Sequence, residues 1–323
     1  MGRRKGRPVN GILLLDKPLN MSSNSALQKV RHLFGAAKAG HTGSLDPLAT
    51  GVLPVCLGEA TKFTQFLLDA DKRYRATFRF GIATASGDAD GEVLSDDGAP
   101  MLTQAQVLAA LPEFRGEIDQ VPSMYSALKH QGQPLYKLAR EGVEIEREAR
   151  QVSIFSLEMM AFRPGEFPEA DVEIHCSKGT YVRTLAEDLG KRLGCGAYVS
   201  KLHRSAAGPF DEGQAISLAE LQALGDSGSF PALDALLLPM DAGIQHLEAV
   251  ELSADSAFYF RQGQPVMVPQ VYQRSEEGDI VRVFENRDQD DRGELPDESS
   301  PLFLGVAEVT DDGRVAPKRL VVF

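Results

Sequence analysis

Residues 40–54 read GHTGSLDPLATGVLP, and this stretch places one carboxylate, that of Asp46, in a turn built from glycine and proline. Gly43 and Gly51 permit a positive φ and the close approach of another part of the backbone. Pro47 disfavours helical geometry at Asp46 and so favours an extended backbone there. Such a turn can present a nucleophile or a base to a ligand, but Asp, Gly and Pro are also ordinary residues of surface turns. The stretch by itself leaves both interpretations open.

The composition is that of an ordinary globular protein, with 43% hydrophobic and 25% charged residues among 323. This length suggests one large domain and a smaller one. No apolar run approaches the roughly 20 residues of a membrane helix, and the basic start GRRKGR does not continue into a secretory signal. The three cysteines show no CxxC spacing and the six histidines no ligand spacing. We therefore expect a cytoplasmic protein without a metal or a membrane partner.

The net charge of −12 is unevenly distributed along the chain. Residues 1–75 carry twelve Lys or Arg against five Asp or Glu, whereas residues 273–300 carry four Arg against ten acids. A local positive face, and not the total charge, governs phosphate binding. Because the stretch around Asp46 lies in the basic part, the sequence leaves RNA open as a partner.

Hydrophobic periodicity predicts strands and helices without a strict βαβ rhythm, which is typical of an α+β fold. In the strand 74–82 apolar even-numbered residues alternate with polar odd-numbered ones, so Tyr74 faces the same side as Phe78. Further strands are expected at 9–15, 52–57, 152–162, 170–176 and 199–210. Helices are expected from Ser22 or Ser23 to about 34, from about 60, at 103–111 and 135–140, after Tyr181 to 193, and at 217–224 and 231–236.

After about residue 248 the pattern changes to short β-like runs at 264–268, 280–284, 302–308 and 319–322. The insertion 285–300 is acidic and low in apolar residues, so we expect it to be a mobile loop. The segment DADGE at 88–92 has an incomplete series of calcium ligands and is interpreted as a turn.

The run GHTGSLDPLATGVLPVCLGEATKF, which begins at residue 40, resembles the signature of the TruB family, the bacterial tRNA pseudouridine synthases that modify the T-loop. Three further segments agree with that family in order and content, namely GILLLDKP at 11–18, KRYRA at 72–76 and SKGTYVRTL at 177–185. The resemblance extends over residues 9–212. It implies a pseudouridine-synthase fold with a mixed, largely antiparallel sheet flanked by helices.

The resemblance also implies a domain organisation. Residues 9–247 are expected to form the catalytic domain, in which the insertion 118–150 holds the RNA stem-loop. Residues 248–323 look like the small β-rich, PUA-like RNA-binding domain at the C-terminus of the family. Residues 1–8 are expected to be a basic flexible tail.

The chemistry of pseudouridine formation defines what the site must contain. A C–N glycosidic bond breaks, the uracil turns, and C5 joins the sugar, with no redox change or net hydrolysis, so no cofactor is needed. A carboxylate is a suitable nucleophile because its adduct can form and leave again. The resemblance assigns this role to Asp46, and whether it attacks the base or the sugar stays open.

Two further catalytic residues follow from the resemblance. Arg183 is expected to lie beside Asp46, to lower the pKa of its carboxylate and to keep it ionised. Tyr74 is expected to stack on the target base, and its hydroxyl is a candidate acceptor for the C5 proton. Without the resemblance, Arg183 would be interpreted as a surface charge, and Tyr74 equally well as a core aromatic.

Four more residues are candidates for binding the substrate. Tyr181 shares a turn with Arg183, and the resemblance implies that His41 fills the space left by a flipped nucleotide, although a lone histidine is more often structural. Lys17 matches the Lys-Pro pair of the family, and simple solvation explains it as well. Leu202 resembles an apolar residue that packs under the uracil, and it could equally be core.

The sequence thus predicts a stand-alone isomerase that converts the uridine at position 55 in the T-loop of tRNA, flipped out of its stack, to pseudouridine. Two alternatives are a non-catalytic tRNA-binding or folding module and a guide-RNA-dependent relative within a ribonucleoprotein. The trio of Asp46, Tyr74 and Arg183 argues against the first. The sequence PLAT at 47–50 and the absence of a Lys-rich tail argue against the second. The expected partner is the tRNA T-stem-loop, and the expected oligomeric state is a monomer.

Overall fold

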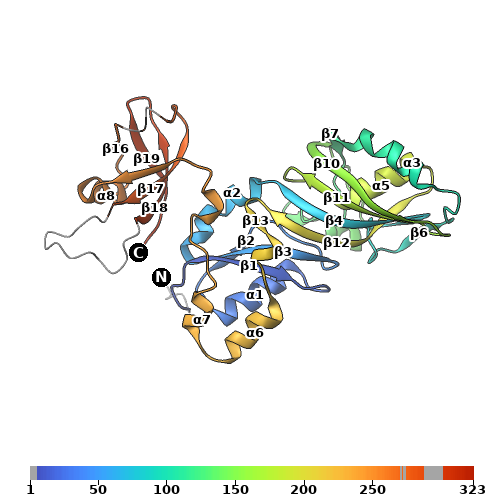
Figure 1. The fold of residues 1–323 in the computed structure, drawn as a ribbon, viewed down its shortest axis with the longest axis horizontal. Helices are drawn as coiled ribbons and strands as arrows, with labels where there is room; N and C mark the ends of the chain where they lie inside the picture. Colours follow the sequence, from blue (N-terminus) through green and yellow to red (C-terminus); the bar gives the residue numbers. More distant parts are fainter. Residues whose placement is uncertain (1–5, 270, 272–273, 287–300) are drawn as a thin grey trace.

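The computed structural model describes residues 6–269, 271, 274–286 and 301–323, and it shows a large mixed sheet with helices packed on it and a smaller C-terminal sheet (Figure 1). The large sheet has ten strands in the order β14-β1-β3-β12-β4-β11-β10-β7, with β2 beside β3 and β13 beside β12. Its strands are β1 (Gly11–Lys17), β2 (Ala39–His41), β3 (Ala49–Leu57), β4 (Lys72–Phe80), β7 (Gly116–Gln120), β10 (Arg150–Arg163), β11 (Glu169–Cys176), β12 (Ala197–Ala207), β13 (Phe210–Asp211) and β14 (Ile216–Ser217). The predicted α+β class is confirmed.

Most neighbouring strands of the large sheet run antiparallel, as predicted, and among the described strands β1–β14 and β3–β12 are its parallel pairs. The β3–β12 pairing matters for the site because it places Leu202 opposite Ala49 and Arg204 opposite Gly51. Gly51 has a φ of 101°, and a Cβ atom there would lie 2.2 Å from the carbonyl oxygen of Arg204. Only glycine allows β12 to approach β3 this closely.

Helices bury the apolar faces of the large sheet in two groups. One group, α3, η2 and α5, covers the side of β4 that carries Phe78, and the other, α1, α6 and α7, covers β1 and β3 around Leu53. Helix α1 begins after Ser22, whose side chain accepts a hydrogen bond from the Ser25 amide, as in an ordinary N-cap. The bounds are α1 (Ser23–Leu33), α3 (Gln104–Ala110), η2 (Leu111–Phe114), α5 (Val182–Arg192), η3 (Glu212–Gln214), α6 (Leu218–Asp226), α7 (Phe230–Asp234) and η4 (Ala242–Ile244).

Several elements differ from the sequence-based prediction. The helix expected from about residue 60 starts as a 3-10 helix, η1 (Gly58–Phe63), and becomes α-helical only in α2 (Thr64–Asp69). The Thr61 hydroxyl donates to the Gly58 carbonyl three residues before it, which supports the tighter 3-10 spacing. The strand expected at 199–210 divides into β12 and β13 because Gly208, at a φ of 59°, reverses the chain.

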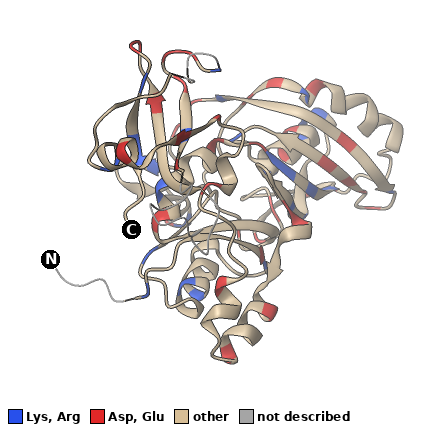
Figure 2. Cartoon of the chain, turned by 60° about the vertical axis from the view of Figure 1, so that its left-hand side comes forward, with Lys and Arg blue, Asp and Glu red and all other residues tan. Residues whose placement is uncertain are grey.

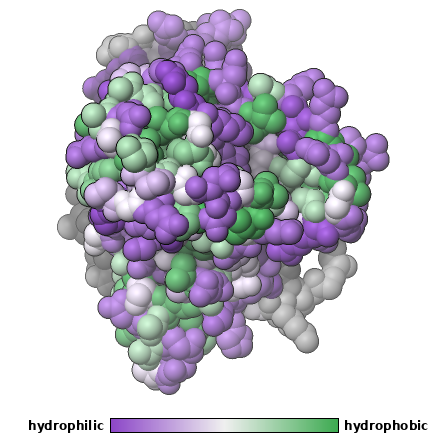
Figure 3. Space-filling model, turned by 90° about the vertical axis from the view of Figure 1, so that its right-hand side faces the viewer, coloured by the Kyte–Doolittle hydropathy of each residue, from purple (hydrophilic) through white to green (hydrophobic). Residues whose placement is uncertain are grey.

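Two small hairpins extend from the large sheet. Strands β5 (Ile82–Thr84) and β6 (Val93–Asp96) lie near α3, at the end of the molecule seen in Figure 3, where apolar and polar side chains are interspersed. Strands β8 (Lys129–His130) and β9 (Gln133–Pro134) lead into α4 (Leu135–Arg140), which has the predicted bounds. We refer to residues 129–140 as the basic hairpin. Within the described residues, none of the helices combines the length and apolar character needed to cross a membrane.

The C-terminal part forms a second sheet in the order β15-β17-β18-β19-β16, with helix α8 against it and a core that includes Phe260. Its elements are β15 (Ala249–Leu252), α8 (Ala254–Arg261), β16 (Val266–Met267), β17 (Ile280–Glu285), β18 (Leu302–Val309) and β19 (Arg314–Leu320). This sheet contacts the region around α2, since the ring centroids of Phe63 and Phe303 are 5.2 Å apart and Lys62 Nζ donates to the Leu320 carbonyl at 2.7 Å. From residue 287 to 300, the insertion expected to be mobile lies outside the described residues.

The chain near the N-terminus is attached to the body at Arg7. Its guanidinium donates two hydrogen bonds to Asp234, at 2.6 and 2.7 Å, and lies 4.2 Å from the ring centroid of Phe230. Residues 1–5 of the expected flexible tail lie outside the described residues. The expectation of a tail reaching residue 8 was wrong at Arg7, because an ion pair and an aromatic ring hold this side chain.

Candidate active site

The turn that carries Asp46 opens into a cavity of about 330 Å³. The cavity lies where β4 and β12 meet the start of α5. Its lining comprises residues 43–46, Leu68, Lys72, Tyr74, Ser126, Ala127, Ser177, residues 179–183, Leu202 and Arg204. Five of the seven site residues predicted from the sequence therefore meet here, although they come from segments far apart in the chain.

Asp46 is held in place by hydrogen bonds on both sides of it. The buried Ser23 hydroxyl, at the start of α1, accepts from the Leu45 amide at 2.7 Å and donates to the Leu45 carbonyl at 2.9 Å. The Pro47 carbonyl accepts from the Asn20 amide at 2.8 Å. The side chain of Asp46 remains 41% exposed. The turn is thus fixed while its carboxylate stays accessible from the cavity.

Arg183, near the start of α5, is the partner of Asp46. Its Nε lies 3.0 Å from Asp46 Oδ2, and its Nη1 lies 3.3 Å from Asp88 Oδ2. Nη1 also donates to the Ser86 carbonyl, and Nη2 to the Tyr125 carbonyl, both at 3.0 Å. The predicted contact between Arg183 and Asp46 is confirmed, and the same guanidinium also binds two neighbouring loops. All of its hydrogen-bonding nitrogens are engaged, so its orientation is fixed.

The electrostatics of Asp46 differ from the prediction. Burial raises the pKa of its carboxyl, Arg183 and Lys17 lower it, and the nearby carboxylates of Asp88 and Asp90 raise it. The net shift is upward, whereas the sequence suggested that the arginine would dominate. The expected effect of Arg183 is present, but desolvation and like charges outweigh it.

Tyr74 and Leu202 form the part of the cavity that lies on the sheet. Tyr74 is half-buried on β4, and Leu202 lies on β12 with 8% of its surface exposed. Burial raises the pKa of the Tyr74 hydroxyl, and the charge of Arg204 opposes this rise. An aromatic ring and an aliphatic side chain beside a carboxylate are suited to enclose a planar base.

Tyr181 lines the cavity, whereas His41 and Lys17 are not among its lining residues. The backbone of Tyr181 exchanges two hydrogen bonds with the Gln120 side chain, at 3.0 and 3.3 Å. Lys17 is completely buried, which excludes the simple solvation considered from the sequence, and its Nζ donates to the Met21 carbonyl at 2.6 Å. Burial lowers its pKa to about 8. Burial, and then the charge of Arg204, lowers the pKa of His41.

Three residues of the site were not predicted from the sequence. Lys72 and Arg204 line the cavity, and Asp88 binds Arg183. Alternation along β4 and β12 could have identified the first two, since Lys72 is two residues before Tyr74 and Arg204 two residues after Leu202. The segment around Asp88 does form the predicted turn, in which the Asp90 amide donates to Asp88 Oδ1 at 3.1 Å. No group of three or more potential metal ligands occurs within the part of the chain that the structure describes.

A larger hollow of about 920 Å³ shares Leu202 with this cavity. It is lined by residues 75–77 of β4 and by Arg163, which is paired with Asp171 at 2.5 Å. Its charges are largely neutralised by one another, and neither Asp46 nor Tyr74 lines it. We therefore place the active site in the smaller cavity.

Comparison with known families agrees with this geometry. The model of the TruB family pseudouridylate synthase N-terminal domain matches residues 31–182. Two C-terminal models, one described as the tRNA pseudouridylate synthase B C-terminal domain and one as the C-terminal part of pseudouridine synthase II TruB, match residues 183–245 and 249–321. These matches, on the fold described above, define the protein as a pseudouridine synthase.

Full-length relatives give the same result with a narrower assignment. Proteins named tRNA pseudouridine synthase B from Saccharophagus degradans, Stutzerimonas stutzeri and Coxiella burnetii are 55%, 52% and 50% identical to the chain. The alignments cover 99%, 99% and 98% of this chain and 99%, 98% and 96% of the relatives. The chain belongs to the TruB family, as its sequence motifs indicated.

Solved structures confirm the fold at much lower sequence identity. A chain in the crystal structure of a Cbf5-Nop10-Gar1 complex matches with a TM-score of 0.69 at 23% identity, covering 96% of this chain and 84% of the other. A chain in a structure of an H/ACA RNP bound to a substrate RNA containing 2′-deoxyuridine also has a TM-score of 0.69, at 20% identity, with 100% and 92% covered. Both likenesses concern the fold alone.

Proposed function

We propose that this chain isomerises the uridine at position 55 in the T-loop of tRNA, with Asp46 as the nucleophile and the target base turned out of its stack. Its membership of the TruB family makes it an enzyme that converts uridine in tRNA to pseudouridine. The observation that supports the finer proposal is the Asp46–Arg183 pair, 3.0 Å apart, in a cavity that Tyr74 also lines. A binding module would not require this combination.

The cavity offers a role for each of these side chains. Asp46 attacks the nucleotide and leaves again, while Arg183 orients its carboxylate through the Nε contact. Tyr74 stacks on the uracil and accepts the C5 proton, and Leu202 packs against the base from β12. Tyr181 closes the cavity from the turn before α5. Lys17 and His41 lie outside the cavity lining. His41 is proposed to fill the space that the flipped nucleotide leaves in the RNA, and Lys17 to bind the substrate from beside the Asp46 segment.

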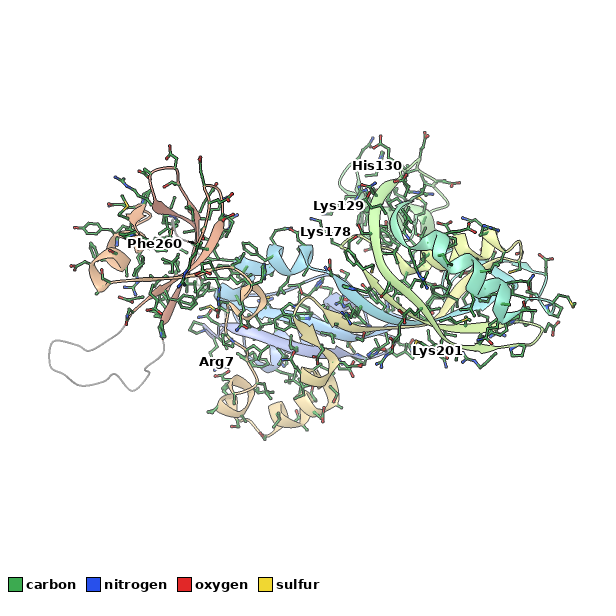
Figure 4. All side chains as sticks on the ribbon, turned by 45° about the horizontal axis from the view of Figure 1, so that its top comes forward. Arg7, Lys129, His130, Lys178, Lys201 and Phe260 are labelled. Atoms are coloured by element: carbon green, nitrogen blue, oxygen red, sulfur yellow. The ribbon has the colours of Figure 1, made fainter. Side chains whose placement is uncertain are left out.

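The RNA is expected to approach from the side of the basic hairpin. Figure 4 shows Lys129 and His130 of this hairpin and Lys178 near one another at one side of the molecule, whereas Lys201 lies away from them on the sheet. Helix α4 adds Lys137 and Arg140. Figure 2 shows charges of both signs along the central sheet, so the cations of the hairpin are the better phosphate ligands.

Within this proposal, residues 9–247 form the catalytic domain and residues 248–323 a PUA-like RNA-binding domain. The two contact each other through Phe63 and Phe303. The domain 248–323 holds eight Lys or Arg against sixteen Asp or Glu. Its contribution to tRNA affinity should therefore come from a local patch, and it is measured by comparing tRNA binding with and without residues 248–323.

The experiment that tests the function uses T-loop RNA that carries tritium on uridine C5. Formation of pseudouridine releases this tritium into water, so the purified chain should release it and Asp46→Asn should not. Asp96→Asn, an exposed aspartate on β6, is the matched control and should retain full release. RNA binding without tritium release by the unaltered chain would refute the proposal.

A second measurement separates chemistry from binding. Tyr74→Leu and Arg183→Ala should keep tRNA affinity within about tenfold, about 1.4 kcal/mol, because neither residue belongs to the basic hairpin. Both should lose most of the turnover under saturating RNA. A loss of affinity with unchanged turnover at saturation would contradict the assigned roles.

A further inference from the structure

Arg204 is the largest side chain, among the described residues, that the fold buries almost completely, with 1% exposed. Its Nε donates to the Val52 carbonyl at 2.7 Å, and its Nη2 donates to the Gly43 carbonyl at 3.2 Å. Gly43 precedes Asp46 in the chain and Val52 follows it. One guanidinium therefore holds both ends of the segment that carries the carboxylate. Its rigid fork of donors suits this bridge, whereas a lysine ammonium does not.

Tyr74 is the third neighbour of Arg204. The two residues are direct partners in the antiparallel pairing of β12 with β4. Their side chains therefore leave the sheet on the same face, with Cβ atoms about 5 Å apart, and both line the cavity. Burial raises the pKa of the Tyr74 hydroxyl above its usual value, and the positive charge of Arg204 is the largest influence that opposes this rise. Without the charge of Arg204, burial would raise the pKa of the phenol further.

The chemistry explains why this arrangement matters. Once C5 of the uracil is joined to the sugar, its C5–H bond must break. The proton passes to an acceptor, the electron pair of the C–H bond restores the C5=C6 double bond, and the displaced pair on N1 takes a proton from water. A tyrosine can accept the C5 proton effectively only as its phenolate, because the neutral phenol is a very weak base.

We propose that Arg204 is the positioning residue for this step, holding Tyr74 and the Asp46 segment in one arrangement and keeping the Tyr74 phenolate available for the C5 proton. The inference rests on the proposed function, in which Tyr74 is the base. It adds a residue that acts through Tyr74 and does not touch the reacting atoms itself.

The other groups around Tyr74 do not supply this charge. Cys176 on β11 and Asp46 in the turn both raise the pKa of Tyr74. Lys72 lies two residues before Tyr74 on the same strand, but its Nζ donates to carbonyls at the end of α2, one of them at 2.7 Å. Burial also lowers the pKa of Lys72 to about 8, so Lys72 loses its proton more readily than a guanidinium does. Arg204 is the permanent cation beside the phenol.

The test measures tritium release from C5-tritiated T-loop RNA as a function of pH, in single turnovers with the enzyme in saturating excess. In the plot of log rate against pH, the rising part, called the limb below, should report the ionisation of Tyr74 to its phenolate. Arg204→Gln should move the limb to higher pH by about one to two units, and so lower the rate at neutral pH about 10- to 100-fold, tenfold for each unit of pKa. Arg204→Lys keeps the charge but not the fork, so the rate should fall while the limb stays near its original pH.

Matched controls distinguish this role from a merely structural one. Arg192→Gln removes an exposed arginine at the end of α5 and should leave rate and limb unchanged. Arg204→Gln with a lower rate and melting temperature but an unmoved limb would show that Arg204 only supports the fold, and would overturn the proposal. If Arg204→Gln does not fold, the pH profile of Arg204→Lys tests the proposal instead. Because this variant keeps the positive charge, a limb displaced to higher pH would contradict the proposal.

A change in the acidity of Tyr74 gives an independent readout. 3-Fluorotyrosine at position 74 is a more acidic phenol, so in the Arg204→Gln background it should return the limb toward lower pH and recover the rate. Absence of recovery would overturn the proposal. The proposed function would fail in a different way, through tritium release by Asp46→Asn or through an unchanged limb in Tyr74→Phe. Neither of these results depends on Arg204.

Discussion

The two carboxylates that share Arg183 should respond differently when each is replaced by its amide. Arg183 and Asp88 are 5% and 7% exposed, so Asp88→Asn leaves a buried guanidinium with one counter-charge fewer. Asp46, at 41% exposed, belongs to the part of the network that solvent reaches. We therefore expect Asp88 to contribute mainly to stability, and Asp46 to contribute to activity without stabilising the fold.

The sign of the Asp46 contribution follows from its raised pKa. The folded-state pKa lies above the ordinary value of 3.8, so stability falls as the pH rises from 3.8 through the folded-state value. At pH 7 the Asp46 carboxyl thus does not stabilise the fold, and Asp46→Asn should leave the melting temperature unchanged within about 3 °C, or raise it. This variant should nevertheless be inactive.

The magnitude for Asp88 can be estimated from its contacts. Removal of one partner of a buried pair costs roughly 3–5 kcal/mol. In Asp88→Asn the side-chain amide oxygen can still accept the hydrogen bond that the Asp90 amide donates at 3.1 Å. We therefore expect the lower end, about 3 kcal/mol. Each kcal/mol lowers the melting temperature of a domain of this size by roughly 2–4 °C, so the expected decrease is about 6–12 °C.

Thermal unfolding followed by far-ultraviolet circular dichroism at pH 7 measures both variants, with Asp96→Asn as the exposed control. The reasoning is refuted if Asp46→Asn lowers the melting temperature as much as Asp88→Asn does. Equal decreases in melting temperature would mean that the different solvent exposure of Asp46 and Asp88 does not determine how much each contributes to stability. A melting temperature unchanged in Asp88→Asn would equally contradict the assignment of the buried pair.

Three further predictions concern the sheet, the buried lysine and the RNA surface. Gly51→Ala places a Cβ atom 2.2 Å from the Arg204 carbonyl oxygen, so the melting temperature or the folded yield should fall strongly, and an unchanged melting temperature would contradict the β3–β12 pairing. The pKa of Lys17 falls from 10.5 to about 8 on folding, so between these pH values the unfolded chain binds more protons and stability rises with pH. Lys17→Met should make that rise smaller in melting curves, and an identical rise would exclude Lys17 as its source. Lys129→Glu should weaken tRNA binding and reduce the slope of log affinity against log salt by about one or more, whereas Lys191→Glu, at the far end of α5, should not. Equal salt slopes for the unaltered chain and both variants would show that the hairpin does not contact phosphates.

Much of the sheet could be predicted because its strands bury one face. Alternation along β4 identified the side on which Tyr74 and Phe78 lie, and the same rule would have placed Lys72 and Arg204 in the site. The Asp88–Arg183 pair could not be predicted, because the two residues are far apart in sequence and the turn around Asp88 has no signal beyond ordinary turn residues. Helix α8 was missed because Phe258 and Tyr259 are exposed beside buried Ala257 and Phe260, which obscures its periodicity.

The net upward shift of the Asp46 pKa could not be predicted from the sequence either, and it explains how the site is organised. Burial disfavours the charged forms of Asp46, Lys17 and Lys72 alike. Lys17 and Lys72 donate hydrogen bonds to backbone carbonyls, and Asp46 pairs with Arg183, so the fold fixes the position of each group. Such preorganisation is what makes charged groups effective in catalysis, because they need not reorient during the reaction. The glycines and the proline around Asp46 serve this purpose, since they fix a turn against which β12 can place Arg204.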